Sequence, residues 1–147
     1  MFRHPWLHIP DFFAMIIYMR DSQLLAEKIY AAVRMIPCGK VASYSQIAAL
    51  AGNRNLRRYV GNVLHKNPSN KITPCHRVVN AKGFCSGSFA FGGPDVQRKK
   101  LEDEGVVFVD EHVDMLRCCI TEDDFEIMRA ELEKQVSSGI LTKQAIL

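Results

Sequence analysis

The sequence predicts a mainly α-helical domain with short strands, built around a winged helix-turn-helix-like core. The chain has 147 residues, of which 48% are hydrophobic. This is enough for one or two compact units with a core, but the chain is too short for a large multidomain enzyme. Apolar residues recur at helical spacing in several segments, and two short helical segments are separated only by a Gly-Asn turn. A longer helix precedes them, and this order is typical of a helix-turn-helix.

The first predicted helix follows an N-terminal extension, residues 1–20, to which we assign no role. An apolar run at 12–19 is far shorter than a membrane span and lacks the small-residue cleavage site of a signal peptide. Asp21 or Ser22 can cap the helix, which ends at 37–40, where proline and glycine occur. Its inward positions are apolar: Leu25, Ile29, Val33 and Ile36.

Two shorter helices are predicted next, at 44–51 and about 54–66. Ser43 and Gln46 have the spacing of a capping box, and Gly52 suits the left-handed conformation that ends the first helix. The second helix carries a polar or small outer side, at about 100° per residue: Arg54, Arg58, Gly61, Asn62 and His65. This face suits close approach to a phosphate chain, and it is also the pattern of an ordinary solvated helix.

The rest of the main domain, residues 21–117, is predicted to hold a loop, a helix and a short strand. Glycine and phenylalanine recur within 83–93, which indicates either a pocket-shaping loop or an ordinary Ω-loop. Pro94 suits the first turn of a helix that reaches Glu104, and a short extended run follows at 106–109.

A C-terminal helical extension, residues 118–147, completes the chain. Thr121 and Asp124 form a second capping box, which predicts an amphipathic helix that finishes near residue 137.

Positive charge is concentrated in residues 28–94, which contain ten Lys or Arg and no Asp or Glu. The formal net charge of the whole chain is only +3, because residues 95–147 hold seven basic and thirteen acidic residues. An ordinary solvated surface mixes both signs, whereas each carboxylate near a polyphosphate partner would repel it. The charge distribution therefore favours nucleic acid as the partner.

Five cysteines, at 38, 75, 85, 118 and 119, are odd in number and include no Cys-x-x-Cys pair. Neither a disulfide framework nor a zinc ribbon is indicated, so we expect an intracellular protein with no metal and no other cofactor. Cys75 is distinctive because it follows Pro74 and precedes His76 and Arg77. A thiol beside an imidazole and a guanidinium is a candidate nucleophile, although unpaired cysteines are more often small buried hydrophobic residues.

Five strings occur in this chain in an order and at intervals that resemble a known family: Ser43-Tyr44-Ser45-Gln46-Ile47-Ala48, Arg58-Tyr59-Val60-Gly61, Lys66-Asn67-Pro68, Pro74-Cys75-His76-Arg77-Val78-Val79 and Glu104-Gly105. Over residues 24–117 the chain resembles the DNA-binding domain of the O6-alkylguanine-DNA alkyltransferases. The resemblance implies that Cys75 irreversibly accepts an alkyl group from O6 of a guanine flipped out of double-stranded DNA. It also implies a helix-turn-helix that binds the minor groove. We expect a monomer.

The resemblance supplies the expected catalytic residues. A free thiol ionises near pH 8.5, so only a few per cent of it is thiolate at neutral pH. His76, held by Glu104, would accept the proton of Cys75. Adjacent side chains in extended backbone point apart, so a water would bridge Cys75 and His76, while Asn67 would brace the turn.

The expected DNA-binding residues lie mainly on the helix pair. The resemblance implies that Arg58 fills the space left by the flipped nucleotide and that Tyr44 pushes on the neighbouring phosphate. A guanidinium is suited to this role because it is both charged and flat. The set is completed by five further residues: Arg54, Gly61, Asn62, Lys66 and Arg77.

Two departures from the family pattern keep alternative functions open. The compact chain is similar to the alkyltransferase-like proteins, which bind alkylated DNA but carry another residue where this chain has Cys75. The loop 85–93, with Ser88-Phe89-Ala90-Phe91, is longer than the usual loop and lacks its tyrosine or tryptophan. A lesion sensor that does not repair DNA is therefore the alternative. A plain helix-turn-helix regulator is disfavoured, because it has no need of Cys75, His76 and Glu104 together.

Overall fold

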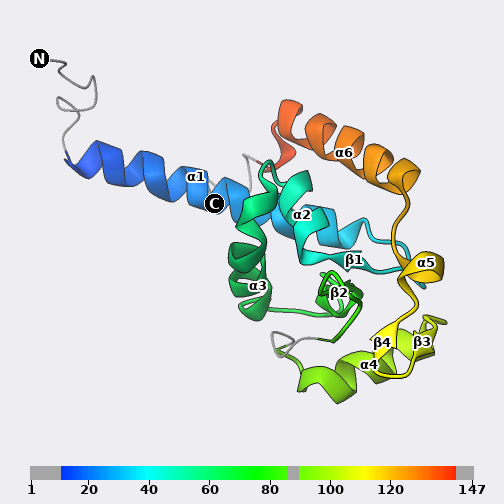
Figure 1. Cartoon of the computed structure of the whole chain (residues 1–147). Helices are drawn as coiled ribbons and strands as arrows, with labels where there is room; N and C mark the ends of the chain where they lie inside the picture. Colours follow the sequence, from blue (N-terminus) through cyan, green and yellow to red (C-terminus); the bar gives the residue numbers. More distant parts are fainter. Residues whose placement is uncertain (1–10, 86–89, 142–147) are drawn as a thin grey trace, which may run out of the picture.

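The computed structural model describes residues 11–85 and 90–141 as a mainly helical fold with short strands, as the sequence predicted (Figure 1). The helices are α1 (Asp11–Arg34), α2 (Tyr44–Leu50), α3 (Arg57–His65), α4 (Gly93–Asp103), α5 (Met115–Cys118) and α6 (Glu122–Ser137). Two 3-10 turns are η2 (Arg54–Leu56) and η3 (Cys75–Arg77). The strands are β1 (Ala42–Ser43), β2 (Val78–Val79), β3 (Phe108–Val109) and β4 (His112–Val113).

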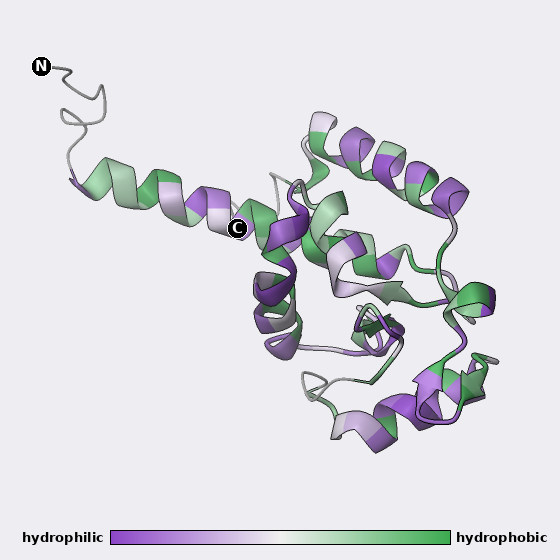
Figure 2. Cartoon of the chain, in the orientation of Figure 1, coloured by the Kyte–Doolittle hydropathy of each residue, from purple (hydrophilic) through white to green (hydrophobic). Residues whose placement is uncertain are grey.

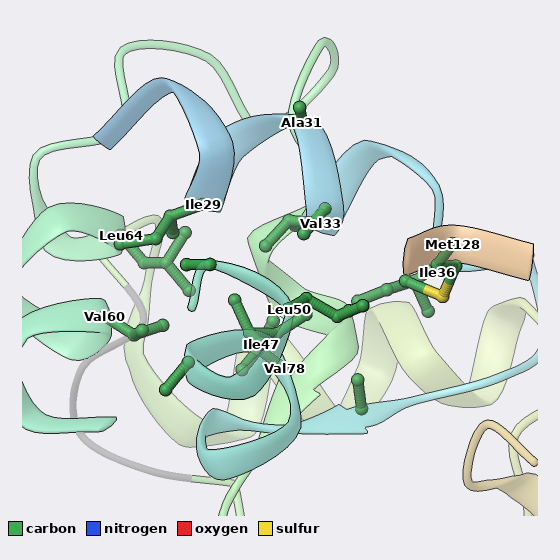
Figure 3. Packing of buried hydrophobic residues seen from close by; sticks show 14 of the residues in the cluster. Ile29, Ala31, Val33, Ile36, Ile47, Leu50, Val60, Leu64, Val78 and Met128 are labelled. Carbon is green, nitrogen blue, oxygen red and sulfur yellow. The ribbon is translucent and has the colours of Figure 1, made fainter. Parts of the chain in front are cut away.

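The core consists of two hydrophobic clusters. The larger one joins α1, α2, α3 and α6, and Figure 3 shows Ile29, Ile47, Val60 and Met128 packed within it. The smaller one holds six buried residues: Val41, Val79, Leu101, Val106, Val113 and Cys118. Cys75 and Val78 belong to the larger cluster and Val79 to the smaller one, so the segment that carries Cys75 contributes to both.

Two small sheets fix the connections between these clusters. β1 pairs in parallel with β2, with Ala42 opposite Val78 and Ser43 opposite Val79. Ser43 is also the N-cap of α2, so this pairing brings the start of the helix-turn-helix next to the strand that follows η3. β3 and β4 form an antiparallel hairpin after α4. β3 corresponds to the extended run predicted at 106–109, but it is shorter.

The helix-turn-helix follows the predicted capping pattern at its start. Ser43 and Gln46 make both hydrogen bonds of the capping box, and Gly52 has a φ of 123°, which an L side chain rarely adopts. The prediction of one helix from 54 to 66 was wrong in its first turn. Asn53 caps the separate turn η2, because its side chain accepts a hydrogen bond from the backbone of Asn55.

The predicted start of the first helix was also wrong, because α1 begins at Asp11 rather than at Asp21 or Ser22. Residues 12–19 contain no proline or glycine to stop the helix, and the Ser22 hydroxyl bonds back to the Tyr18 carbonyl instead of capping. This added part of α1 projects from the body (Figures 1 and 2). Most of its apolar side chains are exposed. Residues 1–10 of the predicted extension lie outside the described residues.

Among the helices of residues 11–85 and 90–141, none is both long enough and apolar enough to cross a bilayer.

The C-terminal helix α6 packs onto the larger cluster. Met128 and Leu132 are buried, and the predicted capping box of Thr121 and Asp124 is present. Asp124 also accepts a hydrogen bond from Lys40 at 2.6 Å, which connects the start of α6 to the segment before β1. The short helix α5 was not predicted, because four residues give no periodic pattern.

Candidate functional site

Cys75 begins the compact turn η3, and its side chain is almost completely buried, with 5% exposure. The backbone N–H of Cys75 donates to the Thr73 carbonyl at 2.8 Å, and that of Arg77 donates to the Pro74 carbonyl at 3.0 Å. The expectation of extended backbone here was therefore wrong. A 3-10 turn places successive side chains about 120° apart, so Cys75 and His76 do not point in opposite directions.

Asn67 braces this turn, as predicted. Its Nδ2 donates to the Thr73 carbonyl at 2.8 Å, and its Oδ1 accepts from the Ser69 backbone at 3.2 Å. The Thr73 hydroxyl in turn accepts from Arg34 Nε at 3.0 Å. Because Asn67 directly follows the end of α3, this clasp connects the helix-turn-helix to the segment that carries Cys75.

His76 contacts Glu104, as predicted, through its Nε2 at 2.7 Å from Oε1. Glu104 caps the C-terminus of α4 and also accepts from Arg77, whose Nε lies 2.9 Å from Oε2 and whose Nη2 lies 3.0 Å from Oε1. Arg77 Nη1 donates to the Ile36 carbonyl at 2.8 Å. Arg77 was predicted to be a DNA contact, but its guanidinium is turned inward and holds Glu104.

These contacts set the charges in the site. Burial lowers the pKa of His76 below its ordinary value, and the hydrogen bond with Glu104 offsets this only in part. Burial opposes ionisation of Glu104, but hydrogen bonds from Arg77 and His76 outweigh it, so the pKa of this carboxyl is lowered. At neutral pH the site therefore contains a neutral imidazole held by an ionised carboxylate.

Asn70 is a member of the site that the sequence analysis missed. Its Nδ2 lies 3.4 Å from Cys75 Sγ and 3.2 Å from His76 Nδ1, so one amide nitrogen is within hydrogen-bonding distance of both groups. The amide nitrogen of Asn70 thus joins these two side chains directly, and the bridging water expected from the sequence stays a prediction. The only signal in the sequence was a second asparagine shortly after Asn67.

Gln97 of α4 is a second residue of the site that was not predicted from the sequence. Its side chain is 1% exposed, and its Nε2 donates to the carbonyls of His76 at 3.1 Å and Val78 at 2.9 Å. Gln97 thus ties α4 to the turn η3. The helical pattern alone predicted an apolar residue at such an inward position.

The outer face of α3 is exposed and basic, as predicted. Arg58 and Asn62 are exposed, Gly61 is half-buried between them, and Lys66 is the exposed C-cap of the helix. Arg54 is exposed in η2, and Tyr44 is half-buried at the first position of α2. Figure 2 shows the hydrophilic colouring of this helix. Arg57 is an exposed cation that we did not select from the sequence.

The cations of this face are not neutralised by any residue that the structure describes. Within residues 11–85 and 90–141, no ion pair involves Arg54, Arg57, Arg58 or Lys66. Such a surface is suited to a polyanion, because its charges keep their attraction for an external phosphate.

Two of the other cysteines are in environments that disfavour the thiolate. Burial raises the pKa of Cys85 to about 11. Burial likewise raises the pKa of Cys119, although a hydrogen bond with Gln46 opposes it. Among the described residues, no group of three or more His, Cys, Asp or Glu side chains could hold a metal ion.

The predicted pocket-shaping loop is described only in part, because residues 86–89 lie outside the described residues. Phe91, at its end, is half-buried against the larger hydrophobic cluster.

A protein-family model matches residues 25–106, and its family is described as "6-O-methylguanine DNA methyltransferase, DNA binding domain". The chain is 33% identical over 102 residues to the methylated-DNA-protein-cysteine methyltransferase of Rattus norvegicus, which covers 69% of this chain and 45% of the rat protein. This chain therefore matches slightly less than half the length of that relative.

Two further relatives are matched over most of their length. Alkyltransferase-like protein 1 of Schizosaccharomyces pombe is 40% identical over 80 residues, which cover 54% of this chain and 73% of that protein. The DNA base-flipping protein of Escherichia coli is 37% identical over 91 residues, which cover 60% of this chain and 67% of that protein. The crystal structure of S. pombe Atl1 with damaged DNA containing O6-carboxymethylguanine has a TM-score of 0.60 and 29% identity, and covers 66% of this chain and 94% of Atl1.

Proposed function

This chain belongs to the 6-O-methylguanine DNA methyltransferase family, and we propose that it repairs DNA by taking the alkyl group of O6-alkylguanine onto Cys75. The resemblance found in the sequence is thereby confirmed at the level of the family. The relatives include proteins named as methyltransferases and proteins named as alkyltransferase-like, so the repair activity of this chain is our proposal.

The contacts of Cys75 are the observation that carries the proposal. Its Sγ accepts from Asn70 at 3.4 Å, and Asn70 in turn contacts His76, which Glu104 holds at 2.7 Å. This is a nucleophile with a donor for its charged form and a neutral base within the same network. A structural cysteine in a core would not require these polar partners.

The transfer is a one-step displacement. The sulfur forms a bond to the alkyl carbon, the bond between that carbon and O6 breaks, and its electron pair remains on the guanine. The thiol proton leaves by way of His76, and the guanine takes up one proton, so no oxidant or cofactor is needed. The thioether product has no easily displaced group, so each protein molecule reacts once.

The outer face of α3 would bring the lesion to this site from the minor groove. An alkylated guanine inside the duplex cannot reach a buried thiol, so the nucleotide must leave the base stack. Arg58 is exposed on α3 and would occupy the vacated space, while Tyr44 at the start of α2 would press on the neighbouring phosphate. We expect the protein to act as a monomer on double-stranded DNA.

A non-repairing lesion sensor is the second candidate. It is favoured by the near-complete burial of Cys75 and by the likeness to Atl1, of which this chain covers 94%. Such a protein would bind alkylated DNA through the same α3 face and leave the alkyl group in place.

The two candidates differ in the fate of the DNA. Purified protein is incubated with a duplex that contains one O6-methylguanine, and the DNA is then digested and its nucleosides are quantified. Repair predicts conversion of O6-methylguanine to guanine in proportion to the protein added, with none in Cys75→Ala. Tight binding without any loss of O6-methylguanine would favour the sensor.

A further inference from the structure

We propose that Asn70 is a positioning residue that stabilises the thiolate of Cys75 while keeping the facing nitrogen of His76 unprotonated. The reaction with DNA rests on the proposed function, but the effect of Asn70 on the thiol is a property of the protein alone. It can therefore be measured without DNA.

The geometry gives the two hydrogens of one amide nitrogen two different acceptors. Asn70 Nδ2 lies 3.4 Å from Cys75 Sγ and 3.2 Å from His76 Nδ1. A hydrogen bond to a charged acceptor is stronger than one to a neutral acceptor, so the N–H that faces Sγ favours the thiolate over the thiol.

The tautomer of His76 follows from its other partner. Glu104 is held as a carboxylate by Arg77, and a carboxylate only accepts, so Nε2 of His76 must carry the hydrogen of the 2.7 Å contact. The neutral imidazole then has its lone pair on Nδ1. This atom can only accept, which fixes Asn70 with its nitrogen, and not its oxygen, toward the site.

The arrangement distinguishes two states of the ionised site. If the thiol proton stayed on His76 Nδ1, the new N–H would point at the N–H of Asn70, and two donors that face each other cannot form a hydrogen bond. If the proton passes on to solvent, both hydrogens of Asn70 keep their acceptors. Asn70 therefore favours a thiolate beside a neutral His76 over an ion pair of the two, and His76 serves as a passage for the proton.

Other titratable or charged groups lie around this pair and act in both states. They are Tyr30 and Arg34 of α1, Arg77 of η3, and Lys100 and Glu104 of α4 and its C-cap. None of them donates a hydrogen bond to Cys75 Sγ within the described residues, so the proposed effect is particular to Asn70.

The test compares Asn70→Leu, which keeps the shape but removes the donor, and Asn70→Asp, which replaces it with a negative charge. The rate of alkylation of Cys75 by iodoacetamide is followed against pH by peptide mass analysis. A change in the accessibility of the thiol alters the plateau of the alkylation rate at high pH. Loss of the hydrogen bond instead moves the midpoint of the pH profile. We expect the rate at pH 7 to fall about three- to tenfold in Asn70→Leu and more than tenfold in Asn70→Asp.

Two controls accompany these variants. Cys38 is exposed, so its alkylation measures the activity of the reagent in every sample. Asn55→Leu changes an exposed asparagine whose side chain makes no hydrogen bond with the described residues, and its Cys75 profile should match that of the unmodified protein. A midpoint that is the same in Asn70→Leu and the unmodified protein would overturn the proposal.

A second measurement needs no variant and so does not depend on their folding. The ¹⁵N chemical shifts of His76 are recorded across the pH range in which Cys75 becomes reactive. The proposal predicts that Nδ1 stays unprotonated while Nε2 keeps its hydrogen. Protonation of Nδ1 as the thiolate forms would contradict it. If Asn70 behaves as predicted but O6-methylguanine DNA is not repaired, the proposed function fails and the inference about Asn70 stands.

Discussion

Helices α3 and α6 pack on the same hydrophobic cluster, but their exposed faces carry opposite charge. α3 buries Val60, Val63 and Leu64, and α6 buries Met128 and Leu132. The exposed side of α3 is basic. The exposed side of α6 is mainly acidic, with Glu122, Asp123, Glu126, Glu131 and Glu133. Similar apolar spacing therefore builds two helices whose surfaces suit different roles.

The arginines of the two helices make this difference concrete. Arg129 of α6 donates to Glu126 at 2.6 Å and to Glu133 at 2.8 Å, and the hydrogen bond with Glu126 raises the pKa of this arginine. Arg58 of α3 has no such partner among the described residues. An arginine already paired with two carboxylates gains little from an external phosphate, whereas Arg58 gains the full interaction.

The largest expected effect comes from Arg58→Ala. If Arg58 fills the space of the flipped nucleotide, the rate of alkyl transfer should fall about a hundredfold, because flipping costs a few kcal/mol, while DNA affinity falls only about threefold. Single-turnover transfer and equilibrium binding are measured on the same duplex. Arg129→Ala is the matched control and should change neither. Equal losses of rate and affinity in Arg58→Ala would reduce Arg58 to a phosphate contact.

The next effect concerns the structural role of α6. Asp124→Ala removes the 2.6 Å contact with Lys40 and the capping hydrogen bond that Asp124 accepts from the Thr121 backbone N–H at 2.8 Å. We expect the free energy of unfolding to fall by about 1 to 2 kcal/mol, with DNA affinity unchanged. Urea unfolding measures the first quantity and a binding titration the second. Reduced affinity in the folded variant would show that α6 takes part in DNA binding.

A smaller effect is expected for single cations beside α3. Arg54→Ala and Lys66→Ala should each weaken binding a few-fold and reduce the slope of log affinity against log salt by about one. Lys134→Ala, on α6, should leave the slope unchanged. A slope that stays the same in both α3-side variants would mean that these cations do not contact phosphates.

The pH dependence of stability should be the smallest effect. Because burial lowers the pKa of His76, the unfolded chain takes up a proton that the folded chain refuses as pH falls below the ordinary value of 6.5. Stability should therefore decrease with acidification from that point. Glu104, whose pKa is also lowered in the fold, adds a second loss below its ordinary value of 4.5. Thermal unfolding of His76→Gln should lack the first loss, and an unchanged decline would exclude His76 as its cause.

The sequence predicted those features that depend on local pattern. Both capping boxes, the Gly52 cap and the basic face of α3 follow from spacing and residue type within a few positions. The contact of His76 with Glu104 was predicted from the family resemblance. It could not have come from spacing, because 28 positions separate the two residues.

The sequence did not predict contacts that depend on how η3 folds. The inward guanidinium of Arg77 and the amide bridge of Asn70 both result from a turn where extended backbone was expected. The early start of α1 was missed for a different reason. Asp21 and Ser22 resemble a cap, but a preceding helical segment overrides this signal when nothing in it breaks the helix.

Intact-mass analysis of the protein after incubation with an O6-methylguanine duplex shows directly whether Cys75 accepts the alkyl group. If Cys75 is the acceptor, the mass should rise by one methylene group in no more than one equivalent. Peptide analysis should place the gain on Cys75 and leave the other four cysteines unchanged, because among the five cysteines only Cys75 is hydrogen-bonded to the network of Asn70, His76 and Glu104. Tight binding to the lesion with no mass gain after prolonged incubation would contradict the transferase account and favour the lesion sensor.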